Sequence, residues 1–266
     1  MKNYEIIETV CGDVHMTVTR FGSGKRNMIL IPGISLRPVS TGAAAVSYQY
    51  KKAWKDYTVY VFDRKKNIEK GYTVREMAKD TAEVMKKLKI DNAYALGVSQ
   101  GGMILQYLMI DYPCLIKKAV IGSSSARPDE ASIGVISNWS RLAENHDVVA
   151  LNHDCFINIY SEEFLEKYKS GLPLLEQQGS ADECDTFAVL CDSSTEFDAY
   201  GELDKVKCPV LIIGSKKDKV LSVRNSEELA EKLGCEKYIY DGYSHAVYDE
   251  APDYLDRVLE FFERGD

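Results

Sequence analysis

A serine stands between two glycines in the Gly-x-Ser-x-Gly motif at residues 97–101, which is the strongest chemical signal in the chain. The motif directly follows the apolar residues 93–96, and a helix-like segment at 99–111 begins within it. In such a strand–turn–helix context it is typical of a nucleophile elbow, because residues without Cβ let strand and helix approach closely. The pentapeptide alone also arises by chance, so its context carries the prediction. Ser99 is therefore the predicted nucleophile, at a helix N-terminus that favours developing negative charge.

A serine hydroxyl needs a base within hydrogen-bond reach, and the chain has four histidines. His245 comes just after the apolar run 237–241 and before the last helix-like segment. That position is the carboxyl end of a parallel strand, where catalytic groups gather. His245 is thus the predicted base, and surface or packing roles are expected for the other three, His15, His146 and His153.

A carboxylate should hold the imidazole in its productive tautomer. Asp218 follows the apolar run 209–214 by a few residues. The chain order serine, aspartate, histidine is one of the known orders for such a triad. Asp218 is the predicted third member. Three other carboxylates precede this run and are expected to be surface groups or caps: Asp192, Asp198 and Asp204.

Acyl transfer also needs hydrogen-bond donors for an oxyanion. The backbone N–H of Gln100, the residue after the nucleophile, is one predicted donor. The N–H of Ile34 is the other, because it lies in the loop after the early apolar run and Gly33 permits a tight turn there. A plain turn at Pro32-Gly33 is the alternative interpretation.

Short apolar runs and helix-like segments alternate along much of the chain and must position these groups. Residues 4–10 and 13–20 alternate apolar and polar side chains and predict an antiparallel hairpin. The later expected strands are 27–32, 57–62, 93–98, 118–122, 209–214 and 237–241. The expected helices are 73–90, with a capping box from Thr73 to Glu76, 99–111, 225–234 and 251–265. This alternation predicts an α/β fold whose mostly parallel sheet has helices on both faces.

Between residues 125 and 200 the alternation stops and the sequence is helix-like without strands. This predicts a helical cap at 125–200 inserted into a core made of 1–124 and 201–266. Aromatic side chains of the cap are candidates for lining an apolar substrate pocket. They are Trp139, Phe156, Tyr160, Phe164 and Phe187, for each of which ordinary packing is an equal alternative.

The 266 residues suit one large domain, and the net charge of −8 disfavours nucleic acid and anionic lipid as partners. No run approaches the length of a membrane span, and no signal peptide is apparent, so a soluble cytoplasmic protein is expected. The seven cysteines lack C-x-x-C spacing and predict neither a zinc site nor a disulfide framework. No cofactor or metal is expected, and the oligomeric state is left open.

These motifs resemble the α/β-hydrolase fold family over nearly the whole chain apart from the cap. Segment 97–125, GVSQGGMILQYLMIDYPCLIKKAVIGSSS, is similar to enol-lactone hydrolases, carboxylesterases and cofactor-free haloperoxidases or perhydrolases. The resemblance implies Ser99, Asp218 and His245 as triad, with Ile34 and Gln100 as oxyanion donors. A haloalkane dehalogenase would carry aspartate at the nucleophile position, so the serine argues against that branch.

Two segments depart from the family pattern. Residues 31–33 read Ile-Pro-Gly where the family usually has His-Gly, which removes a side chain that often braces the loop. Residues 63–71 replace a compact Arg-Gly-x-Gly-x-Ser turn. The loops that frame the site are therefore altered, and substrate preference does not carry over.

The expected function is hydrolysis of a carboxylic ester or lactone through an acyl-enzyme, with a small ester-like molecule as partner. Acyl transfer, perhydrolysis and C–C bond hydrolysis use the same triad and remain alternatives. A non-catalytic ligand receptor of the same fold is the alternative from another class. A peptidase is less favoured, because the cap shows no cluster of carboxylates obviously placed to hold an α-amine.

Overall fold

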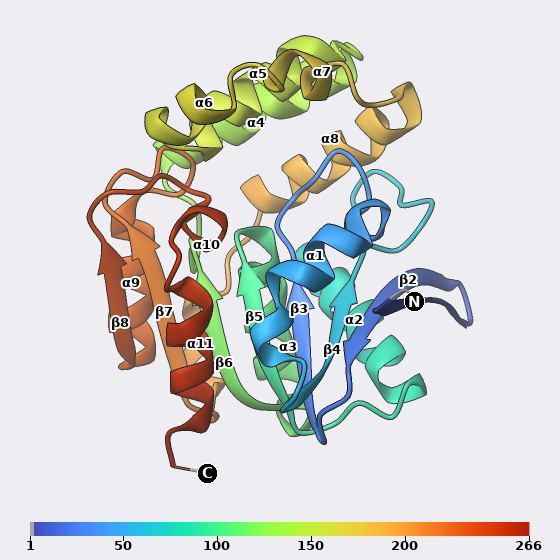
Figure 1. Cartoon of the computed structure of the whole chain (residues 1–266), viewed down its shortest axis with the longest axis vertical. Helices are drawn as coiled ribbons and strands as arrows, with labels where there is room; N and C mark the ends of the chain where they lie inside the picture. Colours follow the sequence, from blue (N-terminus) through green and yellow to red (C-terminus); the bar gives the residue numbers. More distant parts are fainter. Residues whose placement is uncertain (1–2, 266) are drawn as a thin grey trace.

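An eight-stranded sheet forms the centre of the protein in this computed structural model, which describes residues 3–265 (Figure 1). The strand order is β1-β2-β4-β3-β5-β6-β7-β8. β1 and β2 form an antiparallel hairpin, β2 pairs antiparallel with β4, and all later pairs are parallel. The strands are β1 (Tyr4–Cys11), β2 (Val14–Gly22), β3 (Arg26–Ile31), β4 (Tyr57–Phe62), β5 (Ala93–Val98), β6 (Ile116–Gly122), β7 (Val210–Ser215) and β8 (Glu236–Tyr240).

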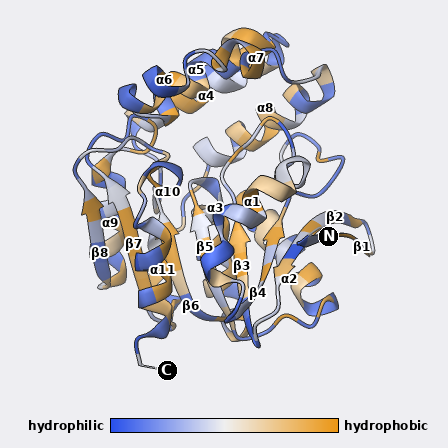
Figure 2. Cartoon of the chain, viewed as in Figure 1, coloured by the Kyte–Doolittle hydropathy of each residue, from blue (hydrophilic) through white to orange (hydrophobic). Residues whose placement is uncertain are grey.

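The central strands are apolar throughout because both faces of the sheet are covered. In β3, Met28 and Leu30 belong to the core on one face, whereas Ile29 and Ile31 belong to the core on the other. Figure 2 shows the hydrophobic colour running along β3 and β4. Side chains alternate between the two faces of a strand, so a strand buried on both sides loses the polar–apolar alternation of a half-exposed one.

Helices cover the two faces. α2, α3 and α9 contribute side chains to the core that holds Ile29, and α11 contributes to the core that holds Met28. Thr73 and Glu76 cap α2 reciprocally, as the sequence predicts. The helices outside the segment between β6 and β7 are α1 (Ala43–Gln49), α2 (Val74–Lys87), α3 (Gln100–Asp111), α9 (Val223–Leu233), α10 (Val247–Glu250) and α11 (Tyr254–Glu263).

Five helices lie between β6 and β7 and sit above the edge at which the parallel strands end (Figure 1). They are α4 (Glu130–Glu144), α5 (Val148–Ile159), α6 (Glu162–Tyr168), α7 (Leu172–Glu176) and α8 (Ala181–Thr195). We call residues 130–195 the inserted segment. The helix-like sequence thus forms five separate helices, of which α6 and α7 are short and are separated around Gly171.

Among residues 3–265, no helix combines the length and the apolar character needed to cross a membrane.

Candidate active site

Ser99 stands at the tight turn between β5 and α3. Its backbone has φ 53° and ψ −126°, a conformation that residues other than glycine rarely adopt. The Ser99 amide donates to the carbonyl oxygen of Gly122 at 2.9 Å. A methyl group at Gly101 would lie 1.9 Å from the carbonyl oxygen of Ile31, and one at Gly97 would lie 2.5 Å from that of Gly101. The two glycines are therefore required for the close strand–helix approach that presents Ser99.

His245 and Asp218 form a buried pair beside this turn. His245 Nδ1 lies 2.8 Å from Asp218 Oδ2, and the side chains are 3% and 1% exposed. The other carboxylate oxygen, Oδ1, accepts from the amides of Val220 and Leu221 at 2.8 and 2.9 Å. These two amides fix the orientation of the carboxylate, so Oδ2 is held toward the imidazole.

Ser99 and His245 line one small cavity of about 20 Å³, which we call the serine cavity. Gly33, Ile34 and Gln100 line it as well. A methyl group on Gly33 would lie 3.0 Å from Ser99 Cβ, a tight contact that glycine avoids where this loop approaches the serine. The structure thus brings Ser99, His245 and both predicted donor residues to one place, with Asp218 behind the imidazole. Their catalytic roles stay predictions.

The alternative histidines and carboxylates lie elsewhere. His15 is exposed on β2, while His146 and His153 are exposed and face Asp185 and Glu176, each at 2.8 Å. None of them lines the serine cavity, and neither do the three alternative carboxylates. Asp192 accepts from Ser140, Asp198 accepts from the amide of Tyr200, and Asp204 pairs with Lys232.

Arg64 joins the loop that carries Ile34 to the start of α3, which carries Gln100, a contact that sequence reasoning missed. Its Nη2 donates to the carbonyl oxygen of Pro32 at 2.7 Å, and Nε and Nη2 donate to Gln100 Oε1 at 3.1 and 3.0 Å. Burial lowers the pKa of Arg64 to about 10, which leaves the guanidinium charged at neutral pH. The altered 63–71 loop therefore supplies a cation that holds the 32–34 loop against the start of α3.

The amide group of Gln100 also reaches the inserted segment. Gln100 is 1% exposed, and its Nε2 donates to the carbonyl oxygen of Leu190 at 2.7 Å and to Ser194 Oγ at 2.9 Å. α8 is therefore attached by hydrogen bonds directly to the residue after Ser99.

A second attachment joins the inserted segment to the loop that carries His245. The amide of Ala246 donates to the carbonyl oxygen of Ile159 at 2.8 Å, and Ser244 Oγ donates to the carbonyl oxygen of Asn158 at 3.1 Å. On the opposite side, Ser123 Oγ donates to the carbonyl oxygen of His245 at 2.8 Å. The position of the imidazole thus depends on both the sheet and the C-terminal end of α5.

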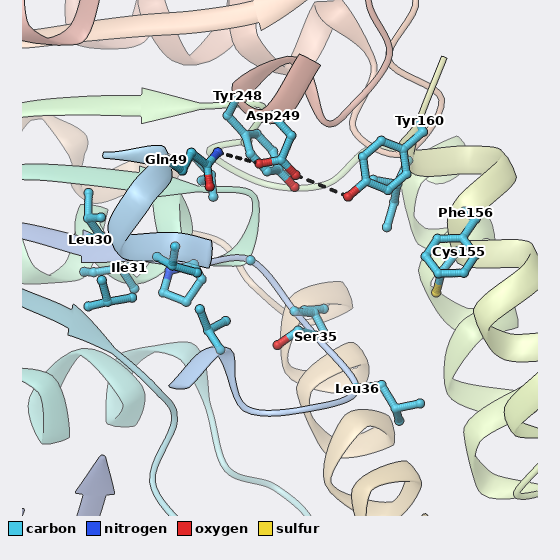
Figure 3. Close-up of a pocket in the computed structure, with 18 of the residues that line it drawn as sticks. Leu30, Ile31, Ser35, Leu36, Gln49, Cys155, Phe156, Tyr160, Tyr248 and Asp249 are labelled. Carbon is cyan, nitrogen blue, oxygen red and sulfur yellow. Dashed lines mark hydrogen bonds between the residues drawn. The ribbon is translucent and has the colours of Figure 1, made fainter. Parts of the chain in front are cut away.

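A larger cavity of about 390 Å³, which we call the main cavity, adjoins the serine cavity (Figure 3). The two share five lining residues: Gly33, Ile34, Trp139, Ile159 and Tyr248. Of the predicted pocket aromatics, Trp139, Phe156, Tyr160 and Phe187 line the main cavity. Phe164 is not among its lining residues; its ring stacks on Tyr160, with centroids 4.3 Å apart.

Solved structures with the same fold cover nearly the whole chain. MGS-M2, an α/β-hydrolase enzyme from a Medee basin deep-sea metagenome library, has a TM-score of 0.84 and 22% identity, covering 98% of both chains. An enol-lactonase from Burkholderia xenovorans has a TM-score of 0.84 and 18% identity, covering 96% of this chain and 99% of that one. The protein therefore has the α/β-hydrolase fold.

A family profile described as serine aminopeptidase, S33, matches residues 70–252, and the chain belongs to this α/β-hydrolase family. The serine hydrolase BPHL of Mus musculus is 23% identical over 263 residues, which cover 94% of this chain and 83% of that protein. A 3-oxoadipate enol-lactonase of Acinetobacter baylyi is 21% identical over 192 residues, which cover 71% and 70%. The protein is accordingly a hydrolase.

Proposed function

We propose that this protein hydrolyses carboxylic esters or lactones through a covalent acyl-serine. One observation carries the proposal: the strained Ser99 turn opens into the same cavity as His245, whose Nδ1 lies 2.8 Å from the buried carboxylate of Asp218. Activation of an alcohol by an imidazole that a carboxylate orients requires these three groups to lie near one another, which supports the proposal. The names of the enol-lactonase relatives give ester-type chemistry further support.

In the proposed mechanism, His245 Nε2 removes the hydroxyl proton of Ser99 as Oγ bonds to the substrate carbonyl carbon. The tetrahedral intermediate collapses, the bond to the leaving oxygen breaks, and the imidazolium returns the proton to that oxygen. Water then attacks the acyl-serine by the same route and releases the acid. Asp218 keeps Nδ1 protonated and stabilises the imidazolium in both half-reactions.

The amides of Ile34 and Gln100 are the proposed donors to the developing oxyanion. Within residues 3–265, neither amide donates a hydrogen bond to another protein group. Both residues line the serine cavity. Donors held free and fixed before the reaction stabilise transition-state charge without reorganising, which is usually a large contribution to catalysis.

We assign Arg64 a positioning role. Arg64→Met should lower kcat about 10- to 100-fold with little change in KM, because Pro32 and Gln100 would lose the side chain that hydrogen-bonds to both of them. Arg64→Lys should recover part of the loss, since an ammonium can reach one acceptor. Ester kinetics on protein with a checked melting temperature measure this effect. Arg20→Met, at an exposed ion pair with Glu5, is the matched control. A raised KM at unchanged kcat would refute the assignment.

Residues 125–200 are proposed to act as a cap over the site. Support comes from the aromatic side chains that the inserted segment contributes to the main cavity and from the attachment of α8 to Gln100. An apolar wall beside a few fixed polar groups is typical of small-molecule pockets, and about 390 Å³ lies within their usual range.

Hydrolysis can be tested with a panel of p-nitrophenyl esters of increasing acyl length, several lactones and one aminoacyl anilide. The anilide is included because the family description names an aminopeptidase. We expect turnover of esters or lactones, together with a stoichiometric mass increase at Ser99 after treatment with an alkyl fluorophosphonate. A protein that cleaves no member of the panel and remains unlabelled would instead fit a ligand receptor.

A further inference from the structure

The main cavity has an apolar wall with one carboxylate in it. Among the described residues that line it there is no lysine, arginine or histidine, and Asp249 is the single acidic residue. The other polar side chains on the wall are neutral. A bound molecule therefore meets negative charge, and no positive charge, along this surface.

Asp249 stands where α10 approaches α1 and the end of α5 (Figure 3). Its Oδ1 accepts from Gln49 Nε2 at 2.9 Å and its Oδ2 accepts from the hydroxyl of Tyr160 at 3.2 Å. A carboxylate offers about four lone-pair sites, so acceptor capacity remains on both oxygens. Surrounding protein raises the pKa of Asp249 by desolvation, yet its side chain stays open to the cavity.

The carboxylate is connected to the reaction site through its neighbour. Tyr248 lines both the serine cavity and the main cavity, whereas Asp249 lines the main cavity alone. A substrate with its carbonyl group at Ser99 can therefore extend past Tyr248 along the apolar wall. The far end of its chain then reaches Asp249.

We propose that the main cavity selects ester or lactone substrates whose distal end carries a hydrogen-bond donor, a hydroxyl or an ammonium group, and rejects chains that end in a carboxylate. Asp249 accepts the donor, and the cation-free wall leaves a second carboxylate without a partner. Rejection arises because like charges repel and the wall offers no cation to pair with a second carboxylate. This inference rests on the proposed esterase function and specifies its substrate class.

Two matched ester series test it. In the first, p-nitrophenyl esters have six-carbon acyl chains that end in methyl, hydroxyl, ammonium or carboxylate. In the second, the same four ends are placed on the alcohol part of acetate esters, so either orientation in the cavity is sampled. In at least one series, kcat/KM should be about tenfold higher for the donor ends than for methyl, and about tenfold lower for carboxylate. The hydroxyl and ammonium members distinguish a neutral donor from a cation.

Asp249→Asn should bring the kcat/KM values for the four chain ends to within about threefold of one another. Asp256, which lies on α11, forms an exposed ion pair with Lys52. Asp256→Asn is the matched control and should leave the selectivity unchanged. Asp249→Ser serves as a second variant if Asp249→Asn has a lower melting temperature than wild type.

Equal rates for methyl and carboxylate ends in both series would overturn the inference, as would an Asp249→Asn effect that is the same for all four ends. Turnover of the methyl-ended ester without discrimination by charge leaves the esterase proposal intact. A complete lack of turnover, with Ser99 unlabelled by fluorophosphonate, overturns both.

Discussion

Ser99→Ala should reduce ester turnover about a millionfold, as dissection of a serine protease triad indicates for loss of the nucleophile. The substitution removes one oxygen atom and leaves the rest of the turn intact, since alanine is smaller than serine and the amide of residue 99 still donates to Gly122. Binding of a substrate analogue should persist, because the cavity walls are unchanged. Stopped assays with concentrated enzyme measure the residual turnover, and a binding titration measures the affinity for the analogue.

Ser23→Ala, an exposed serine before β3, is the control and should retain full activity. Fluorophosphonate should label this control and fail to label Ser99→Ala. If Ser99→Ala kept more than about a thousandth of the wild-type rate, another group would be the nucleophile, and the elbow would have only a structural role.

Asp218→Asn should lower kcat about ten-thousandfold, a smaller loss than that of Ser99→Ala. The amides of Val220 and Leu221 donate to one oxygen of residue 218, so the side-chain oxygen of asparagine should stay on them. Its NH₂ group would then face His245 Nδ1 at the position of the present 2.8 Å contact. A donor there makes Nδ1 the acceptor and leaves the proton on Nε2, which can no longer take the serine proton.

The control is Asp204→Asn, one of the carboxylates that the sequence offered as an alternative, which is exposed and pairs with Lys232. It should remain within about twofold of wild type, because exposed ion pairs contribute little. An unchanged melting temperature for Asp218→Asn would show that the loss of activity comes from the altered His245 tautomer and not from unfolding. Retention of a tenth or more of the activity by Asp218→Asn would remove this residue from the triad.

Much of the fold could be predicted from local patterns. Strand runs such as 57–62 coincide with β4, and the capping box at Thr73 marks the start of α2. Prediction was weaker where helices are short or lack a clear apolar stripe. α1 has seven residues with no side-chain cap at its start, and α5 has a single buried residue, Leu151. Such helices depend on tertiary contacts that are not visible in a local window.

The meeting of Ser99, His245 and Asp218 was predictable because each follows a strand and the strands are parallel, so their ends share one edge. The Arg64 contacts could not be predicted in this way. Arg64 lies in a segment without regular structure, and its partners Pro32 and Gln100 are 32 and 36 residues away in the sequence. The sequence of segment 63–71 does depart from the pattern of its family. That departure was the available signal for a new contact at the 32–34 loop.

The attachment of α5 beside His245 limits how this enzyme can open. Because Ile159 and Asn158 accept hydrogen bonds from the residues on either side of the histidine, an outward movement of that end of the inserted segment would break both bonds and leave His245 held by Ser123 and Asp218. Any movement of the inserted segment that leaves this attachment intact keeps both hydrogen bonds and so preserves the position of the residues that flank His245.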